Sequence, residues 1–240
     1  MMILRSSPAS PFGRKVRIAS AILGIESTIR VQPADPTDTS DTLRRQNPIG
    51  KIPVLVTEDG AALYDSRVIL EYLDHCAGGG RIIPAEPRAR FAALRLQALA
   101  DGVMDASILQ VYERRWRAAE KHETKWLDHQ AGKIERALAA LEADLPGLDS
   151  MPHVGQIATA CALGYRDLRF DGAWRKEYPR LVGWLDEFCR GGSRLRAWLT
   201  ASIRWQPLQA GADDLEMREA PGLSPGLCHK AGRRLIDQNR

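Results

Sequence analysis

The sequence predicts an α/β domain at the N-terminal end of the chain, followed by an all-helical domain. Three observations lead to this fold class. Short apolar runs alternate with helical patterns over residues 1–77, a Gly- and Pro-rich linker follows, and long helical patterns begin at residue 88. At 240 residues the chain is long enough for two packed domains.

A strand and a helix joined by a tight turn open the chain. The apolar run Met2-Ile3-Leu4 predicts the strand, and apolar residues spaced from Val16 to Leu23 predict a helix that Gly24 ends. Ser10 precedes Pro11, so it lies at the helix N-terminus, where unpaired N–H groups stabilise an anion such as a thiolate. Ser10 is therefore either an ordinary cap or a residue that acts on a bound anion.

A Pro-led hairpin and a second helix complete the first domain. The stretch 47–50 predicts a turn, residues 54–57 a buried strand, and Pro53 before that strand fits a cis peptide bond. A hairpin over residues 58–64 leads to Asp65-Ser66 at the next helix N-terminus, either as caps or as groups that hold a charged ligand. The order strand, helix, strand, short helix, hairpin, helix is thioredoxin-like.

The second domain is predicted to be a helical bundle. Its helices are expected at about Arg88 to Trp116, Glu123 to Leu145, Val154 to Phe170, and around Leu181 to Phe188. Asp101 and Asp105 stand four residues apart and so share a helix face. No second cluster of Asp, Glu or His accompanies them, so we expect no metal site. Four further residues either line a pocket for an apolar molecule or belong to the core: Met104, Tyr112, Trp116 and Tyr165.

Three motifs in this order resemble the glutathione S-transferase family, over residues 1 to 190. They are Ser10-Pro11-Phe12 with Arg14-Lys15-Val16, then Asn47-Pro48-Ile49-Gly50-Lys51-Ile52-Pro53, then Asp65-Ser66 with Ile69. The chain is most similar to bacterial members in which a Ser-Pro-Phe turn replaces Cys-Pro-Phe. The resemblance implies a thioredoxin-like domain at 1–77, a helical domain at 88–207 and a tail of unknown structure at 208–240.

The resemblance also implies a role for each site residue. Ser10 would donate a hydrogen bond to the sulfur of glutathione, with Ser7 as the rival hydroxyl. The backbone of Ile52, before Pro53, would pair with the cysteine of glutathione, and Lys51 either reaches its glycyl carboxylate or is a solvated turn residue. The γ-glutamyl end would be held by a set of polar residues, namely Asp65 on its ammonium, Ser66 on its carboxylate, and Asp101 near its amino group.

Two features depart from simple expectations. Arg14 and Lys15 fall in the first turn of a helix, a poor place for cations, and we expect them at the surface or in a subunit contact. The family usually starts its third long helix with a capping Ser or Thr and an Asp. Gln156 and Thr159 stand there instead, which predicts a weak cap.

Composition points to a cytoplasmic protein that binds no membrane. No signal peptide or membrane-spanning run is recognisable, and four scattered cysteines favour neither a disulfide framework nor a zinc site. Residues 190–240 contain nine basic and five acidic side chains, and this excess of four positive charges equals the whole net charge of +4. The basic character therefore belongs to the tail, and we expect no nucleic-acid partner.

The resulting hypothesis is a homodimeric, detoxifying glutathione S-transferase. Glutathione, activated at Ser10, would attack a small electrophile that the sequence does not identify. The alternative is a catalytically silent protein of the same fold with a binding or regulatory role, such as one associated with RNA polymerase. A thiol–disulfide role is less favoured, because it requires Cys at position 10.

Overall fold

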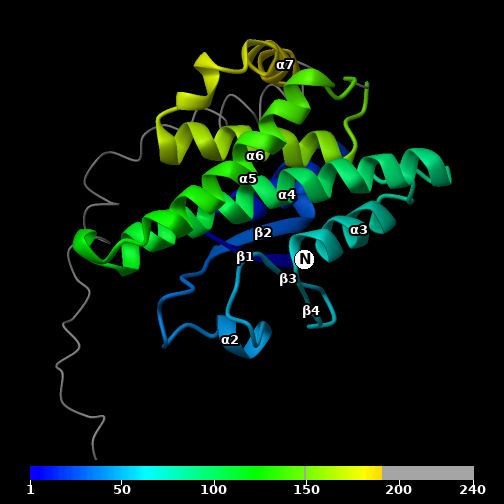
Figure 1. The fold of residues 1–240 in the computed structure, drawn as a ribbon. Helices are drawn as coiled ribbons and strands as arrows, with labels where there is room; N and C mark the ends of the chain where they lie inside the picture. Colours follow the sequence, from blue (N-terminus) through cyan, green and yellow to red (C-terminus); the bar gives the residue numbers. More distant parts are fainter. Residues whose placement is uncertain (149, 191–240) are drawn as a thin grey trace, which may run out of the picture. The chain divides into compact units, whose positions relative to one another are not determined.

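The computed structural model describes residues 1–148 and 150–190, which belong to one compact unit. A sheet with its helices forms the N-terminal part, and long helices form the rest (Figure 1). This architecture confirms the predicted thioredoxin-like domain followed by a helical domain. The end of the predicted second domain, residues 191–207, and the predicted tail, residues 208–240, lie outside the described residues.

The sheet is mixed, with the strand order β2-β1-β3-β4. β1 (Met2–Ser6) pairs parallel with β2 (Ile29–Pro33) and antiparallel with β3 (Val54–Val56). β4 (Ala62–Leu63) pairs antiparallel with β3. The predicted combination of parallel and antiparallel pairing is confirmed.

The helices of the N-terminal part are α1 (Pro11–Leu23), α2 (Leu43–Gln46) and α3 (Ser66–Cys76), with a 3-10 turn at Glu26–Thr28. Gly13 allows α1 to approach β1 closely, because a Cβ there would lie 1.8 Å from the Ser6 hydroxyl oxygen. The first helix therefore begins directly against the carboxyl end of the central strand.

The C-terminal part contains the four helices that the sequence predicts. They are α4 (Pro87–Trp116), α5 (Thr124–Ala143), α6 (Val154–Phe170) and α7 (Pro179–Arg190), with 3-10 turns at Ala119–Lys121 and Ala173–Lys176. Within the described ranges, no helix is both long and apolar enough to cross a bilayer.

The expectation of a weak cap on α6 is wrong. His153 is the N-cap, and its Nδ1 accepts a hydrogen bond from the Gly155 N–H at 3.1 Å. The Gln156 side chain accepts the His153 N–H at 2.7 Å, which completes a capping box. Thr159 lies inside the helix and donates to the Gly155 carbonyl. The prediction failed because it looked for the cap three residues too late.

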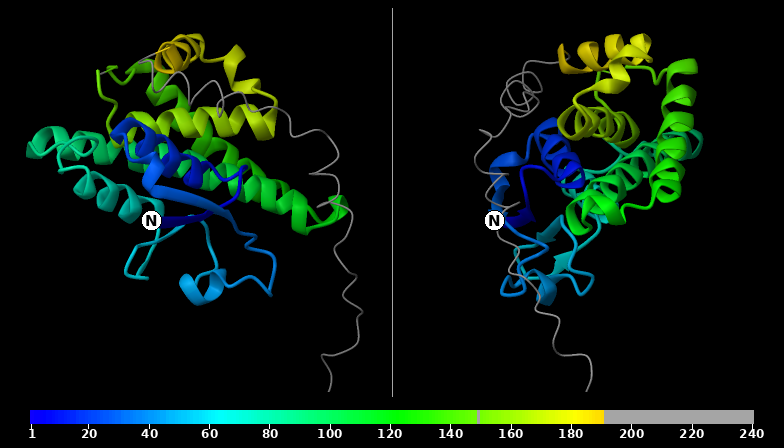
Figure 2. Two further views of the ribbon diagram at one scale, coloured as in Figure 1. Left: turned by 180° about the vertical axis from the view of Figure 1, so that it is seen from behind. Right: turned by 60° about the vertical axis from the view of Figure 1, so that its left-hand side comes forward.

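One hydrophobic core runs through both parts of the described chain. It joins Leu4 and Val16 to Ile157 and Leu163, all of them fully buried. Helix α1 packs against both α3 and α6, as Figure 2 also shows. The predicted boundary falls in the loop between α3 and α4, but no break in the core marks it, so the division into two domains stays a prediction.

Arg14 and Lys15 are buried within the chain itself, which contradicts the prediction that they lie at the surface or in a subunit contact. Arg14 is 8% exposed and Lys15 is 0% exposed. The Lys15 ammonium lies 2.7 Å from Oδ1 of Asp101 on α4 and donates to the Ser66 hydroxyl oxygen at 3.2 Å. Asp101 also accepts a hydrogen bond from Arg67 of α3 at 2.9 Å. The carboxylate of Asp101 offsets the unfavourable helix position, so this cation is stable inside the protein.

Replacing Lys15 by Met should destabilise the fold by about 3–5 kcal/mol, because it leaves the buried Asp101 carboxylate with one cation that is itself half exposed. Urea unfolding followed by circular dichroism measures the change. The matched variant Lys15→Met/Asp101→Leu removes both charges and should recover much of the loss. Native stability in Lys15→Met alone would contradict this account.

Candidate functional site

Ser10 is the N-cap of α1, as one of its two interpretations predicts. Its hydroxyl oxygen accepts the Gly13 N–H at 3.0 Å, and the residue is 9% exposed. Capping uses a lone pair of the oxygen and leaves the O–H to donate elsewhere. The two interpretations are therefore compatible. Ser7, the rival hydroxyl, is partly exposed, and its carbonyl accepts the Ser10 N–H at 3.2 Å.

The predicted cis bond lies between Ile52 and Pro53. Asn47 shapes the turn before it, since its side-chain amide donates to the Lys51 carbonyl at 2.8 Å. Arg5 of β1 lies opposite Val54 of β3, and continuing this antiparallel register brings Ile52 alongside Ser7. The Ile52 backbone and the start of α1 therefore lie at the same end of the sheet.

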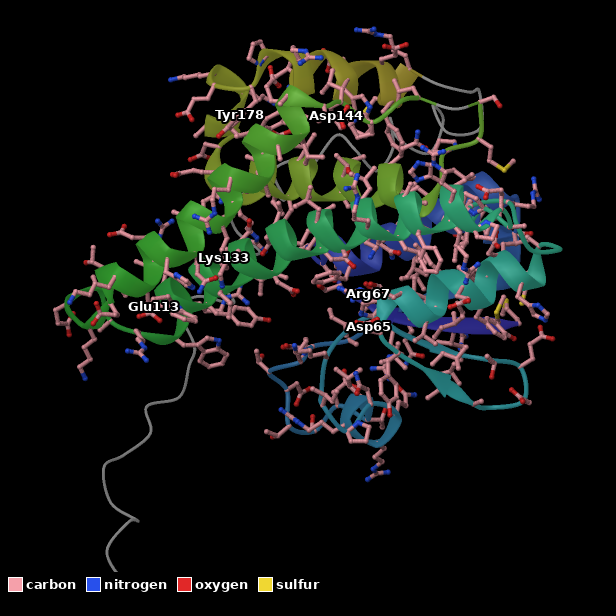
Figure 3. All side chains as sticks on the ribbon, turned by 45° about the vertical axis from the view of Figure 1, so that its right-hand side comes forward. Asp65, Arg67, Glu113, Lys133, Asp144 and Tyr178 are labelled. Atoms are coloured by element: carbon pink, nitrogen blue, oxygen red, sulfur yellow. The ribbon has the colours of Figure 1, made fainter. Side chains whose placement is uncertain are left out.

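Charged and hydroxyl side chains gather at the N-terminus of α3. Asp65 is the N-cap, and its carboxylate accepts the Arg67 N–H at 3.0 Å while the residue remains exposed. Figure 3 shows Asp65 and Arg67 together at this end of the helix. Ser66 is 1% exposed, and its hydroxyl accepts from Lys15, so its side chain lies beneath the surface that Asp65 and Arg67 present.

Asp101 and Asp105 lie on α4 next to this group but differ in exposure. Asp101 is 0% exposed, and its two oxygens are bonded to Lys15 and Arg67. Asp105, one turn later, faces solvent. Its pKa is raised by burial of its inner part and by the charge of Asp101, while Lys51 and Arg67 act in the opposite direction. Asp105 is therefore the carboxylate of this helix that a ligand can reach.

Sequence reasoning missed three members of this site. The sequence predicts Lys15 at the surface or in a subunit contact, gives no signal for Arg67 although it follows Ser66 directly, and favours Asp101 over Asp105. Spacing on α4 gave the correct face, but it could not show which carboxylate the neighbouring helix would bury.

The possible pocket residues divide into two pairs. Met104 and Tyr165 are 0% and 4% exposed and belong to the interior. Tyr112 and Trp116 are 42% and 62% exposed. The core interpretation therefore holds for the first pair, and the second pair is accessible to a ligand.

The described part of the chain offers no cluster of metal ligands, and its buried thiol at Cys161 is not activated. Over residues 1–148 and 150–190, no three His, Cys, Asp or Glu side chains are grouped to hold a metal ion. Burial raises the pKa of the Cys161 thiol to about 12, which keeps it protonated. Ser10 and Ser7 therefore remain the candidate groups for chemistry on an anion at the start of α1.

Replacing Asp105 by Asn should stabilise the unliganded protein at pH 7. Because the pKa of Asp105 is raised from 3.8 on folding, its ionised form is less favourable in the folded state, and the cost disappears at a pH below 3.8. Thermal unfolding between pH 3.5 and 7 measures the difference. Asp38→Asn is a control with the opposite expected effect. Hydrogen bonds from Ser40 lower the pKa of Asp38, so this substitution should destabilise the folded protein at pH 7. A lower thermal stability of Asp105→Asn than of the native protein at pH 7 would contradict the account.

Comparison with known proteins identifies the family. Residues 9–76 match the glutathione S-transferase N-terminal domain, and residues 124–187 match the C-terminal domain. A glutathione transferase family member from Pseudomonas fluorescens Pf-5, solved with bound glutathione, has a TM-score of 0.74 and 41% identity, over 82% of this chain and 98% of that chain.

Curated relatives agree with this result. The uncharacterized GST-like protein YibF of Escherichia coli is 36% identical over 186 residues, which is 75% of this chain and 90% of YibF. A stringent starvation protein A homolog of Coxiella burnetii is 36% identical over 90 residues, or 38% of this chain and 42% of that protein. With both domains matched and most of YibF covered, the chain belongs to the glutathione S-transferase family.

Proposed function

We propose that the protein is a glutathione transferase that activates the thiol of glutathione for attack on a small electrophile. The observation that carries this proposal is the geometry of Ser10. Its hydroxyl oxygen accepts the Gly13 N–H at the start of α1, and its O–H remains available to a ligand sulfur. The glutathione bound to the Pseudomonas fluorescens relative supports the choice of ligand.

Activation follows from elementary electrostatics. A free thiol has a pKa of about 8.5, so little thiolate exists at neutral pH. A hydrogen bond from Ser10 and the positive end of α1 both favour the thiolate over the thiol. The larger thiolate fraction then accelerates attack on an electrophile.

The remaining contacts match each charged or polar part of glutathione with a group of opposite charge or a backbone partner. The Ile52 backbone would pair with the cysteinyl unit as in an added strand, and Lys51 would face the glycyl carboxylate. At the other end, Asp65 and Asp105 would share the γ-glutamyl ammonium, while the Ser66 N–H at the start of α3 would receive its carboxylate. Asp101 would act indirectly, by holding Arg67 and Lys15 in place.

Ser10→Ala should lower kcat by about ten- to a hundred-fold with a small effect on glutathione affinity, because the lost hydrogen bond acts on the developing thiolate. Steady-state kinetics with 1-chloro-2,4-dinitrobenzene measures kcat, and calorimetry measures affinity. Ser7→Ala is the control and should keep native turnover. The reverse result would move the role to Ser7.

Asp65→Asn should weaken glutathione binding by about tenfold or more, because it removes the charge that faces the ligand ammonium. Asn caps a helix as well as Asp does, so the hydrogen bond to the Arg67 N–H and the stability of α3 should remain. Calorimetric titration tests this, with Asp38→Asn as a control that removes one carboxylate to which the proposal assigns no ligand contact. Unchanged affinity in Asp65→Asn would remove the residue from the binding site.

The rival function is a catalytically silent binding or regulatory protein, favoured by the similarity to a stringent starvation protein A homolog over 90 residues. Glutathione binding without turnover of any electrophile would favour this rival. Turnover that depends on Ser10 would exclude it.

A homodimer, a cytoplasmic location and a detoxifying role complete the proposal. Val68 on α3 and Phe91 on α4 are 47% and 70% exposed, and a Glu71–Arg90 ion pair joins the same two helices. Exposed apolar side chains of this size favour contact with another protein surface, and a second copy of the chain is the partner that we propose.

A further inference from the structure

Beyond Asp105, the exposed face of α4 changes from acidic to aromatic and cationic. Tyr112 and Trp116 follow Asp105 by seven and eleven residues, so the three side chains lie on one line of the helix. The step from Asp105 to Tyr112 is about 10 Å along the helix axis. A ligand bound at Asp105 therefore has an aromatic surface within about 10 Å along the helix.

Helix α6 places a buried tyrosine and a half-buried arginine beneath this surface. Tyr165 forms a side-chain hydrogen bond with Arg169. Burial raises the pKa of Tyr165, and Tyr112 acts in the same direction, whereas the charges of Arg169 and Arg115 lower it. The Arg115 guanidinium lies 6.0 Å from the centre of the Tyr112 ring. We call Tyr112, Arg115, Tyr165 and Arg169 the aromatic–arginine cluster.

The cluster is joined by further positive charge. Arg166 lies 3.6 Å above the Phe170 ring, Arg114 lies 5.8 Å from the same ring, and burial together with Arg114 lowers the pKa of Arg166 to about 10. Among ion pairs formed within the described ranges, none involves Arg114, Arg115 or Arg166. The C-terminal end of α4 favours the cations Arg114 and Arg115, and they form no ion pair with a carboxylate of the described residues.

The cluster lies on the same side of the fold as Ser10. Helices α1 and α6 are antiparallel neighbours. Arg81, in the loop after α3, donates to the carbonyl of Leu23 at the C-terminal end of α1. The next residue, Ile82, accepts the N–H of Val154 at the N-terminal end of α6. Farther along, Arg14 lies near enough to Cys161 for its charge to oppose the burial that raises the pKa of that thiol. Ser10 lies one turn before Arg14, and Tyr165 lies one turn after Cys161. The start of α1 and the cluster therefore share one end of this helix pair.

We propose that the aromatic–arginine cluster binds the second substrate, and that this substrate is a planar aromatic electrophile carrying a carboxylate. The inference rests on the proposed transferase function. The ring packs on Tyr112 and Trp116, and the exposed Arg115 guanidinium receives the carboxylate in a charge-assisted hydrogen bond. A neutral aromatic substrate would make no use of the Arg115 charge.

A matched pair of probes tests the proposal, namely 4-chloro-3,5-dinitrobenzoate and its methyl ester. In both, the glutathione thiolate forms a bond to the ring carbon that bears chlorine, the carbon–chlorine bond breaks, and chloride leaves. The thiol proton passes to solvent. Because the ester is intrinsically more reactive, kcat/KM for each probe is divided by its uncatalysed rate constant with glutathione.

The native protein should prefer the carboxylate by about tenfold or more on this scale. Arg115→Gln should bring the ratio close to one. Arg117→Gln is the matched control, because Arg117 stands two residues away and is paired with Glu113 at 3.4 Å. It should keep the native preference.

The outcomes separate this inference from the proposed function. Turnover of both probes without preference for the carboxylate, or a preference that survives Arg115→Gln, overturns the inference and leaves the transferase function intact. Turnover of neither probe, nor of 1-chloro-2,4-dinitrobenzene, by a folded protein that binds glutathione overturns both.

Discussion

The buried carboxylate of Asp101 is the interaction on which the arrangement of the site depends. It binds Lys15 of α1 and Arg67 of α3 from its own position on α4. Ser10 caps the first of these helices, Asp65 caps the second, and the third presents the solvent-facing Asp105, so the proposed glutathione contacts all depend on them. Lys15 and Asp101 are both shielded from water, so neither charge would be solvated if the pair separated. The pair therefore holds the three helices in one relative position. Lys15 also donates to the Ser66 hydroxyl, which ties α1 to the first residue of α3.

Local sequence signals were sufficient for much of the fold. Ser10-Pro11 and Gly24 marked the two ends of α1, and the hairpin and the cis bond at Pro53 were found because turn residues and proline restrict the backbone of their immediate neighbours. The four long helices were found from apolar spacing alone. Asp65 was placed correctly at a helix N-terminus, because capping depends on residues within one turn.

The internal charges could not be predicted in the same way. Lys15 is 86 residues from Asp101 in the chain, and nothing in the local pattern shows that α3 and α4 lie against the helix face on which Lys15 stands. The same packing decides that Asp101 is enclosed while Asp105 remains accessible. The arginines at the ends of α4 and α6 were also overlooked, because their significance is the absence of a carboxylate among described neighbours, which depends on tertiary structure.

The central claim is that the start of α1 lowers the pKa of a bound thiol, and titration of that thiol tests it most directly. Glutathione bound to the native protein is followed by its ultraviolet thiolate absorbance as the pH is changed. The account predicts a midpoint below about 7.5, compared with about 8.5 for a free thiol, and a return toward the free value in Ser10→Ala. A bound thiol that titrates like free glutathione in the native protein would contradict the account.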